Sequence, residues 1–340
     1  MSTTVSIPGK GIQFAFTDTG APANAADYTT FILVHGHTYH AGVFQKLLPL
    51  AAASSVRIIC INRREYQGST PHTPEELRVY ASGSDQERAV LMNEAGVNLA
   101  LAIDGIIQKF ELPSGVALAG WSLGNTFVMA AMSVITSLPD VARTRLQAAV
   151  KTIIMWDPPS QALGIASPPN AYVPLYDPEI EPAARGPAFG KWVASYFIHG
   201  DLSTHDPDKL NYRNADPERK ATYEDMPFPE LLTIVDFSVG DKCDTILTEP
   251  PFAATLATLV EKALFNPKVR AAWPNTKVAY MYGTANAWNV PFTVWDIEKR
   301  VETATGSAPI IFRPIKEANH FVMWEDPTLT LNELIGCTKA

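Results

Sequence analysis

Cysteine is scarce in this chain of 340 residues: there are three, Cys60, Cys243 and Cys337, widely spaced and without a C-x-x-C pair. An odd number of isolated cysteines argues against a disulfide framework and against a structural zinc site, and it suits a reducing compartment. The first residues, MSTTVSIPGKGIQ, lack the charged-then-apolar pattern of a secretory signal. We therefore expect a cytoplasmic protein.

Other signals are missing as well. No uninterrupted apolar run reaches the roughly 18 residues that a membrane-spanning helix needs, so we expect no membrane segment. The net charge of −8, without any run of Lys or Arg, makes a nucleic-acid partner a poor fit. Neither G-x-G-x-x-G nor G-x-x-x-x-G-K-[ST] occurs, so no nucleotide cofactor is expected. These absences favour a protein without a cofactor and without a membrane or nucleic-acid partner.

What the chain does have is an uneven distribution of proline and acid. Of its 27 prolines, 14 lie between Pro158 and Pro251, and the same stretch holds 15 acidic and 7 basic residues, a net charge of −8. The remainder has 20 acids and 20 bases. We therefore predict a core over 1–157 and 252–340, with an inserted Pro-rich, acidic and mainly helical cap over 158–251. A long decorated loop is the alternative interpretation of the insert.

Outside the insert, short apolar runs alternate with helical patterns. Near-continuously apolar strands separated by helices indicate a mostly parallel sheet covered on both faces, hence the α/β class. The predicted strands are 29–36, 56–62, 116–120, 150–156, 277–282 and 310–315. The predicted core helices are 41–53, 84–110, 122–138, 291–304 and 328–335, and those of the insert are 189–198, 231–239 and 252–265.

The sharpest motif is Gly120-Trp121-Ser122-Leu123-Gly124, a G-x-S-x-G between a predicted strand and a predicted helix. The turn is too tight for side chains at the two glycines, so the serine is exposed at its apex. A serine hydroxyl is a weak nucleophile without a base. His320, after the last predicted strand, is the best-placed histidine, and an ordinary loop histidine is the alternative.

Acyl chemistry also needs backbone N–H groups aimed at the developing oxyanion. Leu123, directly after the nucleophile, supplies one candidate. The loop after the first apolar strand, His35-Gly36-His37, supplies the other, and we choose the N–H of His37.

These motifs, in this order, resemble the α/β-hydrolase fold superfamily. The family motif D-x-R-G-x-G-x-S has a degenerate counterpart after the next strand, in Asn62-Arg63-Arg64-Glu65-Tyr66-Gln67-Gly68-Ser69. Here Asn62 replaces the Asp of the motif, and Glu65 and Gln67 replace its two glycines. The resemblance covers the chain except for the insert, which sits where the family places its variable cap. It implies Ser122 as nucleophile and His320 as general base.

The third member of the triad is less plain. Where the family most often places its acid, this chain has Asn286, in Gly283-Thr284-Ala285-Asn286. A minority of the superfamily carries the acid one strand earlier, and zearalenone lactonase is similar in this respect. That strand ends here at Trp156-Asp157-Pro158, so Asp157 is our choice. Asn286 acting alone, or an acid such as Asp296, stays open as an alternative.

Trp121 and Trp156 flank the proposed catalytic turns and are candidate substrate contacts, together with His40. The series His35, His37 and His40 also has the H-x-H-x-x-H spacing of a zinc hydrolase. That motif usually has Asp before its last histidine, where this chain has Tyr39, so we predict no metal site.

The sequence thus predicts a serine hydrolase that cleaves an ester or lactone of a bulky, mostly apolar small molecule, such as a secondary metabolite or toxin, through an acyl-enzyme. One alternative keeps Ser122 and His320 but makes the enzyme a lyase, cyclase or acyltransferase. The other is a binding module on an inactive scaffold.

Overall fold

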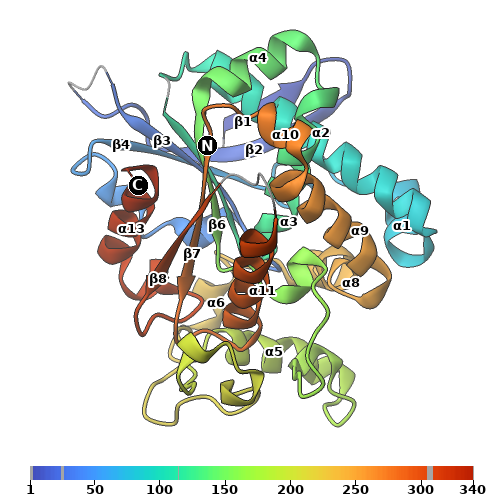
Figure 1. Ribbon diagram of the computed structural model, residues 1–340, viewed down its shortest axis with the longest axis vertical. Coiled ribbons are helices and arrows are strands. Elements are labelled where there is room, and N and C mark those ends of the chain that lie inside the picture. The colour runs from blue at the N-terminus through green and yellow to red at the C-terminus, as the bar shows by residue number, and fades with distance from the viewer. Residues whose placement is uncertain (1–2, 24–26, 114, 305–308, 340) are drawn as a thin grey trace.

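The computed structural model describes residues 3–23, 27–113, 115–304 and 309–339. Eight strands form one sheet in the order β1-β2-β4-β3-β5-β6-β7-β8 (Figure 1). The strands are β1 (Thr3–Ile7), β2 (Ile12–Asp18), β3 (Thr29–Val34), β4 (Val56–Ile61), β5 (Val116–Trp121), β6 (Val150–Trp156), β7 (Lys277–Gly283) and β8 (Ile310–Ile315).

From β4 to β8 all neighbouring strands are parallel, while β1 and β2 form an antiparallel pair at one edge. All six predicted strands are present. The predicted mostly parallel, helix-flanked sheet is therefore confirmed. The sequence prediction missed the β1–β2 hairpin, which extends the same sheet at its antiparallel edge through β4.

Helices cover both faces of the sheet. One apolar core lies beneath α2 and α3, and the other lies beneath α13 and the turns after β3. The helices of the core are α1 (Pro74–Ser82), α2 (Asp85–Lys109), α3 (Gly124–Ser133), α4 (Asp140–Ala149), α10 (Pro267–Ala271), α11 (Asn289–Thr303), α12 (Val322–Glu325) and α13 (Pro327–Lys339).

Helix α2 begins at a capping box, in which Ser84 accepts from the Glu87 N–H and the Glu87 carboxylate accepts from the Ser84 N–H. By length and composition it is the one described helix that could cross a membrane, yet 61% of its apolar window is buried inside the protein. It packs against α3, α9 and β1. These contacts are those of a core helix.

The predicted helix 41–53 is wrong, because this stretch forms two 3-10 turns, Ala41–Phe44 and Leu48–Leu50. Pro49 lacks the N–H that a continuous helix would use and restricts the residue before it. The ring of His40 accepts a hydrogen bond from the Gly42 N–H at 3.1 Å, which caps the first turn.

The Pro-rich segment lies at the carboxyl ends of the parallel strands, at the bottom of Figure 1. Its helices are short, as its prolines require: α5 (Pro182–Val193), α6 (Phe228–Leu231), α7 (Phe237–Val239) and α8 (Thr245–Leu247). α9 (Pro250–Val260) starts inside the predicted cap but packs against α2 and α3 of the core. The Pro-rich segment therefore has no sharp boundary with the core helices at its C-terminal end.

Candidate active site

Ser122 stands at the turn between β5 and α3, where its backbone φ is 54°. This left-handed conformation is uncommon for a residue with a side chain and is often found at functional sites. The neighbouring glycines make the turn possible. A Cβ on Gly124 would lie 2.2 Å from the Val34 carbonyl oxygen, and one on Gly120 would lie 2.8 Å from the backbone of Asn125. The G-x-S-x-G pattern is thus the steric requirement of this turn.

The turn is also fastened to the neighbouring strand. The Ser122 N–H donates to the Trp156 carbonyl at 2.9 Å. The Asn125 side chain donates to the carbonyls of both Ser122 and Trp156, at 2.8 and 3.0 Å. Sequence reasoning missed Asn125, whose position in the first turn after the motif was its only signal.

His320 lies in the loop between β8 and α12 and is 2% exposed. Its ring is 5.0 Å from the Trp121 ring, and the Trp121 indole N–H donates to the His320 carbonyl at 3.1 Å. The preceding Asn319 donates to the cap carbonyl of Ala194 at 2.9 Å. Core and cap together therefore place His320, and its ring lines the same pocket as Ser122.

Asp157 directly follows β6 and, like Ser122, has a left-handed backbone, with φ 45°. Its side chain is fully buried. One carboxylate oxygen accepts from the Gly283 N–H at 2.9 Å, and the other, Oδ2, lies 3.7 Å from His320 Nδ1. The structure therefore brings together the three predicted residues Ser122, His320 and Asp157.

Asn286 occupies the position at which the family most often has its acid, and it too reaches the histidine. Its Nδ2 lies 3.2 Å from His320 Nδ1. Its Oδ1 accepts from the Ala287 N–H at 2.9 Å, which fixes the orientation of the amide. The N–H groups of this amide therefore face His320, and Asn286 cannot also accept a proton from Nδ1. Asp296, in contrast, lies on α11 and pairs with Arg300 at 3.6 Å.

Burial controls the protonation of the pair. It lowers the pKa of His320 to about 3. Burial also raises the pKa of Asp157 well above its ordinary value, although the Gly283 N–H and the Asn286 amide oppose this by binding the carboxylate. The resting imidazole is therefore neutral, which is the form that can accept a proton.

The N–H groups of Leu123 and His37 donate to no acceptor within the described parts of the chain. Both residues line the pocket at Ser122. Gly36, between the two loops, comes so near that a Cβ on it would lie 2.7 Å from the Ser122 Cβ. Both N–H groups are consequently available to a ligand at Ser122.

The side chain of His37 points to the cap. Its Nε2 lies 3.0 Å from the Thr245 hydroxyl and its Nδ1 lies 2.8 Å from the Thr38 hydroxyl. The His37 ring also meets the Phe189 ring edge-on, with centroids 5.3 Å apart. Burial lowers the pKa of His37, so its ring is neutral.

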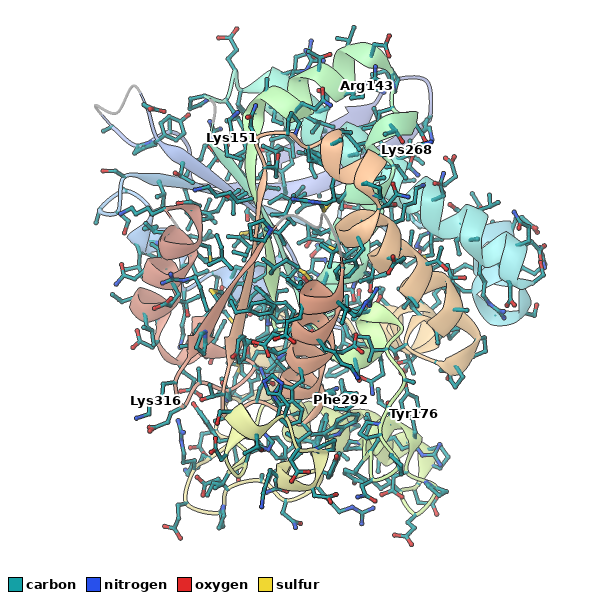
Figure 2. The ribbon with its side chains drawn as sticks, in the orientation of Figure 1. Arg143, Lys151, Tyr176, Lys268, Phe292 and Lys316 are labelled. Carbon is teal, nitrogen blue, oxygen red and sulfur yellow. The ribbon has the colours of Figure 1, made fainter. Side chains whose placement is uncertain are left out.

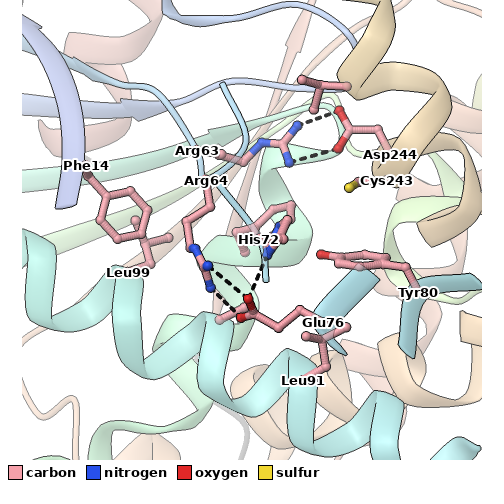
Figure 3. Close-up of a pocket in the computed structure, with 13 residues that line it drawn as sticks. Phe14, Arg63, Arg64, His72, Glu76, Tyr80, Leu91, Leu99, Cys243 and Asp244 are labelled. Atoms are coloured by element: carbon pink, nitrogen blue, oxygen red, sulfur yellow. Dashed lines mark hydrogen bonds and ion pairs between the residues drawn. The ribbon is translucent and has the colours of Figure 1, made fainter. Parts of the chain in front are cut away.

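A buried ion pair that sequence reasoning missed holds the loop after β3 (Figure 3). Arg63 donates to both Asp244 oxygens at 3.0 and 2.7 Å, and to the Gly36 carbonyl at 2.8 Å. Asp244 also accepts from the Thr38 N–H at 3.0 Å. Burial alone would raise the pKa of Asp244, but the Arg63 charge and the hydrogen bonds lower it to about 2. No local pattern signals a pair 181 residues apart.

The three predicted substrate contacts lie outside the pocket at Ser122. Trp121 and Trp156 are 1% and 0% exposed and pack behind the catalytic turns. The ring of His40 caps the turn at Gly42. The structure gives Trp121 a different place, against the ring and carbonyl of His320.

The H-x-H-x-x-H histidines do not converge. The Nε2 of His35 accepts from the Arg63 N–H at 3.0 Å and its Nδ1 faces the Gly36 carbonyl at 3.1 Å. His37 turns to the cap and His40 to its own turn. Within the described residues, no group of three His, Cys, Asp or Glu side chains is placed to hold a metal ion.

This arrangement of sheet, serine turn and histidine loop defines an α/β hydrolase. The model of the Alpha/beta hydrolase family matches residues 31–334, and the chain belongs to this family. No curated protein matches the sequence significantly.

Several solved structures share the fold. A putative aryl esterase from Burkholderia cenocepacia is 14% identical, with a TM-score of 0.54 over 99% of both chains. Epoxide hydrolase A from Mycobacterium thermoresistibile is 16% identical, with a TM-score of 0.51 over 99% of this chain and 97% of that one. The esterase EaEST from Exiguobacterium antarcticum is 16% identical, with a TM-score of 0.50 over 100% of both. At these identities the likeness concerns the fold.

Proposed function

We propose that the protein is a serine hydrolase that cleaves a carboxylic ester or lactone of a bulky, mostly apolar molecule through an acyl-enzyme. The observation that carries the proposal is the convergence of Ser122, His320 and two unpartnered N–H groups on one pocket. A serine at this turn favours acyl transfer over the reactions that the family performs with an aspartate nucleophile.

In the proposed mechanism, the Ser122 hydroxyl oxygen attacks the ester carbonyl carbon while His320 Nε2 accepts the hydroxyl proton. The N–H groups of Leu123 and His37 stabilise the oxyanion. The tetrahedral intermediate collapses, the C–O bond to the alcohol breaks, and His320 returns the proton to the leaving oxygen. Water then attacks the acyl-enzyme by the same steps and releases the acid and free Ser122.

Asp157 has a defined part in this scheme. His320 can use Nε2 as the base only when its proton is on Nδ1, and Asp157 Oδ2, at 3.7 Å, is the acceptor for that proton. Asn286 Nδ2 lies nearer to Nδ1, at 3.2 Å, so the hydrogen bond to Asp157 requires the ring to move toward the carboxylate. Asn286 supports the carboxylate by its N–H group, as its lowering effect on the pKa of Asp157 indicates.

The experiment is covalent labelling with a fluorophosphonate and hydrolysis of short p-nitrophenyl esters. We expect Ser122→Ala to abolish both, and Ser82→Ala, at an exposed serine of α1, to leave both unchanged. Hydrolysis in isotopically labelled water should place the label in the acid product. Full activity of Ser122→Ala would refute the proposal, and unlabelled acid would favour transfer, cyclisation or elimination.

A further inference from the structure

The pocket at Ser122 is small and shares lining residues with two larger pockets. It has a volume of about 40 Å³, whereas its neighbours have about 470 and 820 Å³. The first, here called the Phe189 chamber, is lined by Tyr39, Phe189, Tyr223, Phe228, Leu231 and Phe237. The second, the Tyr172 chamber, is lined by Ile165, Ala171, Tyr172, Pro178, Pro250 and Ala253. The two chambers share no lining residue.

Each chamber shares its own lining residues with the pocket at Ser122, and each shared set is here called a neck. His37, Leu175 and Phe189 line both the pocket and the Phe189 chamber. Gln161, Val173, Tyr176 and Thr248 line both the pocket and the Tyr172 chamber. A group bound at Ser122 can therefore continue into either chamber.

Two short helical segments separate the chambers. In the 3-10 helix η5 (Pro174–Tyr176), Leu175 faces one chamber and Tyr176 the other. At the two ends of α8, Thr245 lines the Phe189 chamber and Thr248 lines the Tyr172 chamber. These two segments form a partition over the catalytic pocket.

A hydrogen bond closes the partition. The Tyr176 hydroxyl lies 2.8 Å from Thr248 Oγ1 and 3.2 Å from the Thr248 carbonyl oxygen. The Thr248 hydroxyl donates to the Thr245 carbonyl at 2.8 Å, so Tyr176 is the donor. Tyr176 stands at the cap end of the molecule (Figure 2). We call this contact the crossbar.

An ester carbonyl carbon carries two groups, the acyl chain and the alkoxy chain. In an acyclic ester these chains diverge and each can enter a different chamber. In a macrocyclic lactone the acyl and alkoxy chains are joined in one ring. A ring with one part in each chamber would therefore have to encircle the crossbar. The ring could do so only if Tyr176 and Thr248 parted.

Given the proposed ester hydrolysis, we infer that the substrate is an acyclic ester with an apolar group on each side of the carbonyl, one group for each chamber. Most of the residues that line the two chambers are apolar, which fits such groups. Each chamber also has three charged lining residues: Asp177, Arg213 and Glu249 in the Tyr172 chamber, and Lys191, Glu224 and Asp241 in the Phe189 chamber. The inference rests on the proposed function and narrows it from ester or lactone to ester.

Two homologous series test this inference: methyl esters with a lengthening acyl chain, and acetate esters with a lengthening alcohol. We expect kcat/KM to rise in both, by up to about fourfold for each methylene that a chamber buries. A macrocyclic lactone with the same number of carbons as a good acyclic substrate should have a kcat/KM that is lower by about 100-fold or more.

Matched substitutions show which chamber holds the acyl group and which holds the alcohol group. Leu231→Trp should fill the Phe189 chamber, so that kcat/KM no longer rises with chain length in one of the two series. Ala253→Trp should fill the Tyr172 chamber and remove the rise of kcat/KM in the other series. Val141→Trp, at an exposed residue of α4, is the control and should leave both series unchanged. Tyr176→Phe removes the crossbar hydrogen bond and should raise the lactone rate relative to the acyclic ester.

Labelling of Ser122 and thermal melting establish that each variant is folded. The inference is overturned if both tryptophans flatten the same series, or if the macrocyclic lactone reacts as fast as the acyclic ester. If the wild-type chain takes no fluorophosphonate and cleaves no ester, the proposed function itself fails. The two failures are thus distinguishable.

Discussion

Replacement of Asp157 by Asn is the sharpest test of the catalytic geometry. The substitution keeps the shape of the side chain, and its Oδ1 can still accept from the Gly283 N–H, 2.9 Å away in the wild type. Its Nδ2, however, would then face His320 Nδ1, where Asp157 Oδ2 lies at 3.7 Å. The wild type already has one donor near Nδ1, the Asn286 Nδ2 at 3.2 Å, so the variant would have two donors there and would lose the Asp157 acceptor. This environment favours the imidazole tautomer with its proton on Nε2, which cannot serve as the base.

The expected loss is large. An acid-to-amide change in a serine triad lowers kcat by about 10⁴-fold, equivalent to roughly 5.5 kcal/mol of barrier. Asn286→Ala should cost far less, because it removes one hydrogen bond to a charged group. Such a bond contributes about 1.5–3 kcal/mol, which corresponds to a loss of roughly 10- to 100-fold.

The assay measures kcat and KM for a p-nitrophenyl ester in Asp157→Asn, Asn286→Ala and the control Asp296→Asn. Asp296 pairs with Arg300 on α11, so its amide should retain full activity. Thermal melting of each variant separates loss of catalysis from loss of folding. A tenfold or smaller effect of Asp157→Asn, combined with a loss of about 10⁴-fold in Asn286→Ala, would refute the assignment and make Asn286 the orienting residue.

Two further predictions concern stability. Asp244→Leu or Arg63→Met alone should cost about 3–5 kcal/mol in urea unfolding, because each leaves one buried charge uncompensated, whereas the double variant should lose less than the sum; additive losses would contradict the pairing. Burial lowers the pKa of His35 and of His320, so between their folded pKa values and pH 6.5 the unfolded chain binds more protons. Stability should therefore fall as the pH drops below 6.5, by up to about 1.4 kcal/mol per pH unit for each histidine. The raised pKa of Asp157 acts in the opposite direction above pH 3.8, because there the folded chain binds more protons at this residue than the unfolded chain does. This opposing effect involves one proton, against one for each of the two histidines. Urea midpoints that are higher at pH 5 than at pH 7.5 would therefore refute the prediction.

The sequence was sufficient to predict the parallel sheet because its central strands are largely buried apolar runs that alternate with helices. It also placed Ser122, His320 and Asp157 correctly at one edge, since each follows a parallel strand and such strands end together. The β1–β2 hairpin escaped prediction because its strands mix polar and apolar residues, as TTVSI and IQFAFTD show. Such a pattern is ambiguous without its partner strand.

Contacts across long sequence separations were beyond the reach of sequence reasoning. Glu65 illustrates this, since it stands where the family motif has a glycine and still adopts φ 75°. Its carboxylate accepts from the His72 N–H and pairs with Lys242 of the cap segment. Tertiary contacts therefore hold a conformation for which the motif normally relies on glycine. The missed Arg63–Asp244 pair fastens the same loop to the same cap segment.

The position of Asp157 links the chemistry to the cap. This residue directly follows β6 and precedes Pro158, where the Pro-rich, acidic segment begins. Its left-handed backbone turns the carboxylate toward His320 and directs the following chain across the pocket, where Gln161 and Val173 line a neck. A cap change that moved Pro158 would therefore also move the acid. Substrate specificity and triad geometry in this protein should consequently vary together rather than independently.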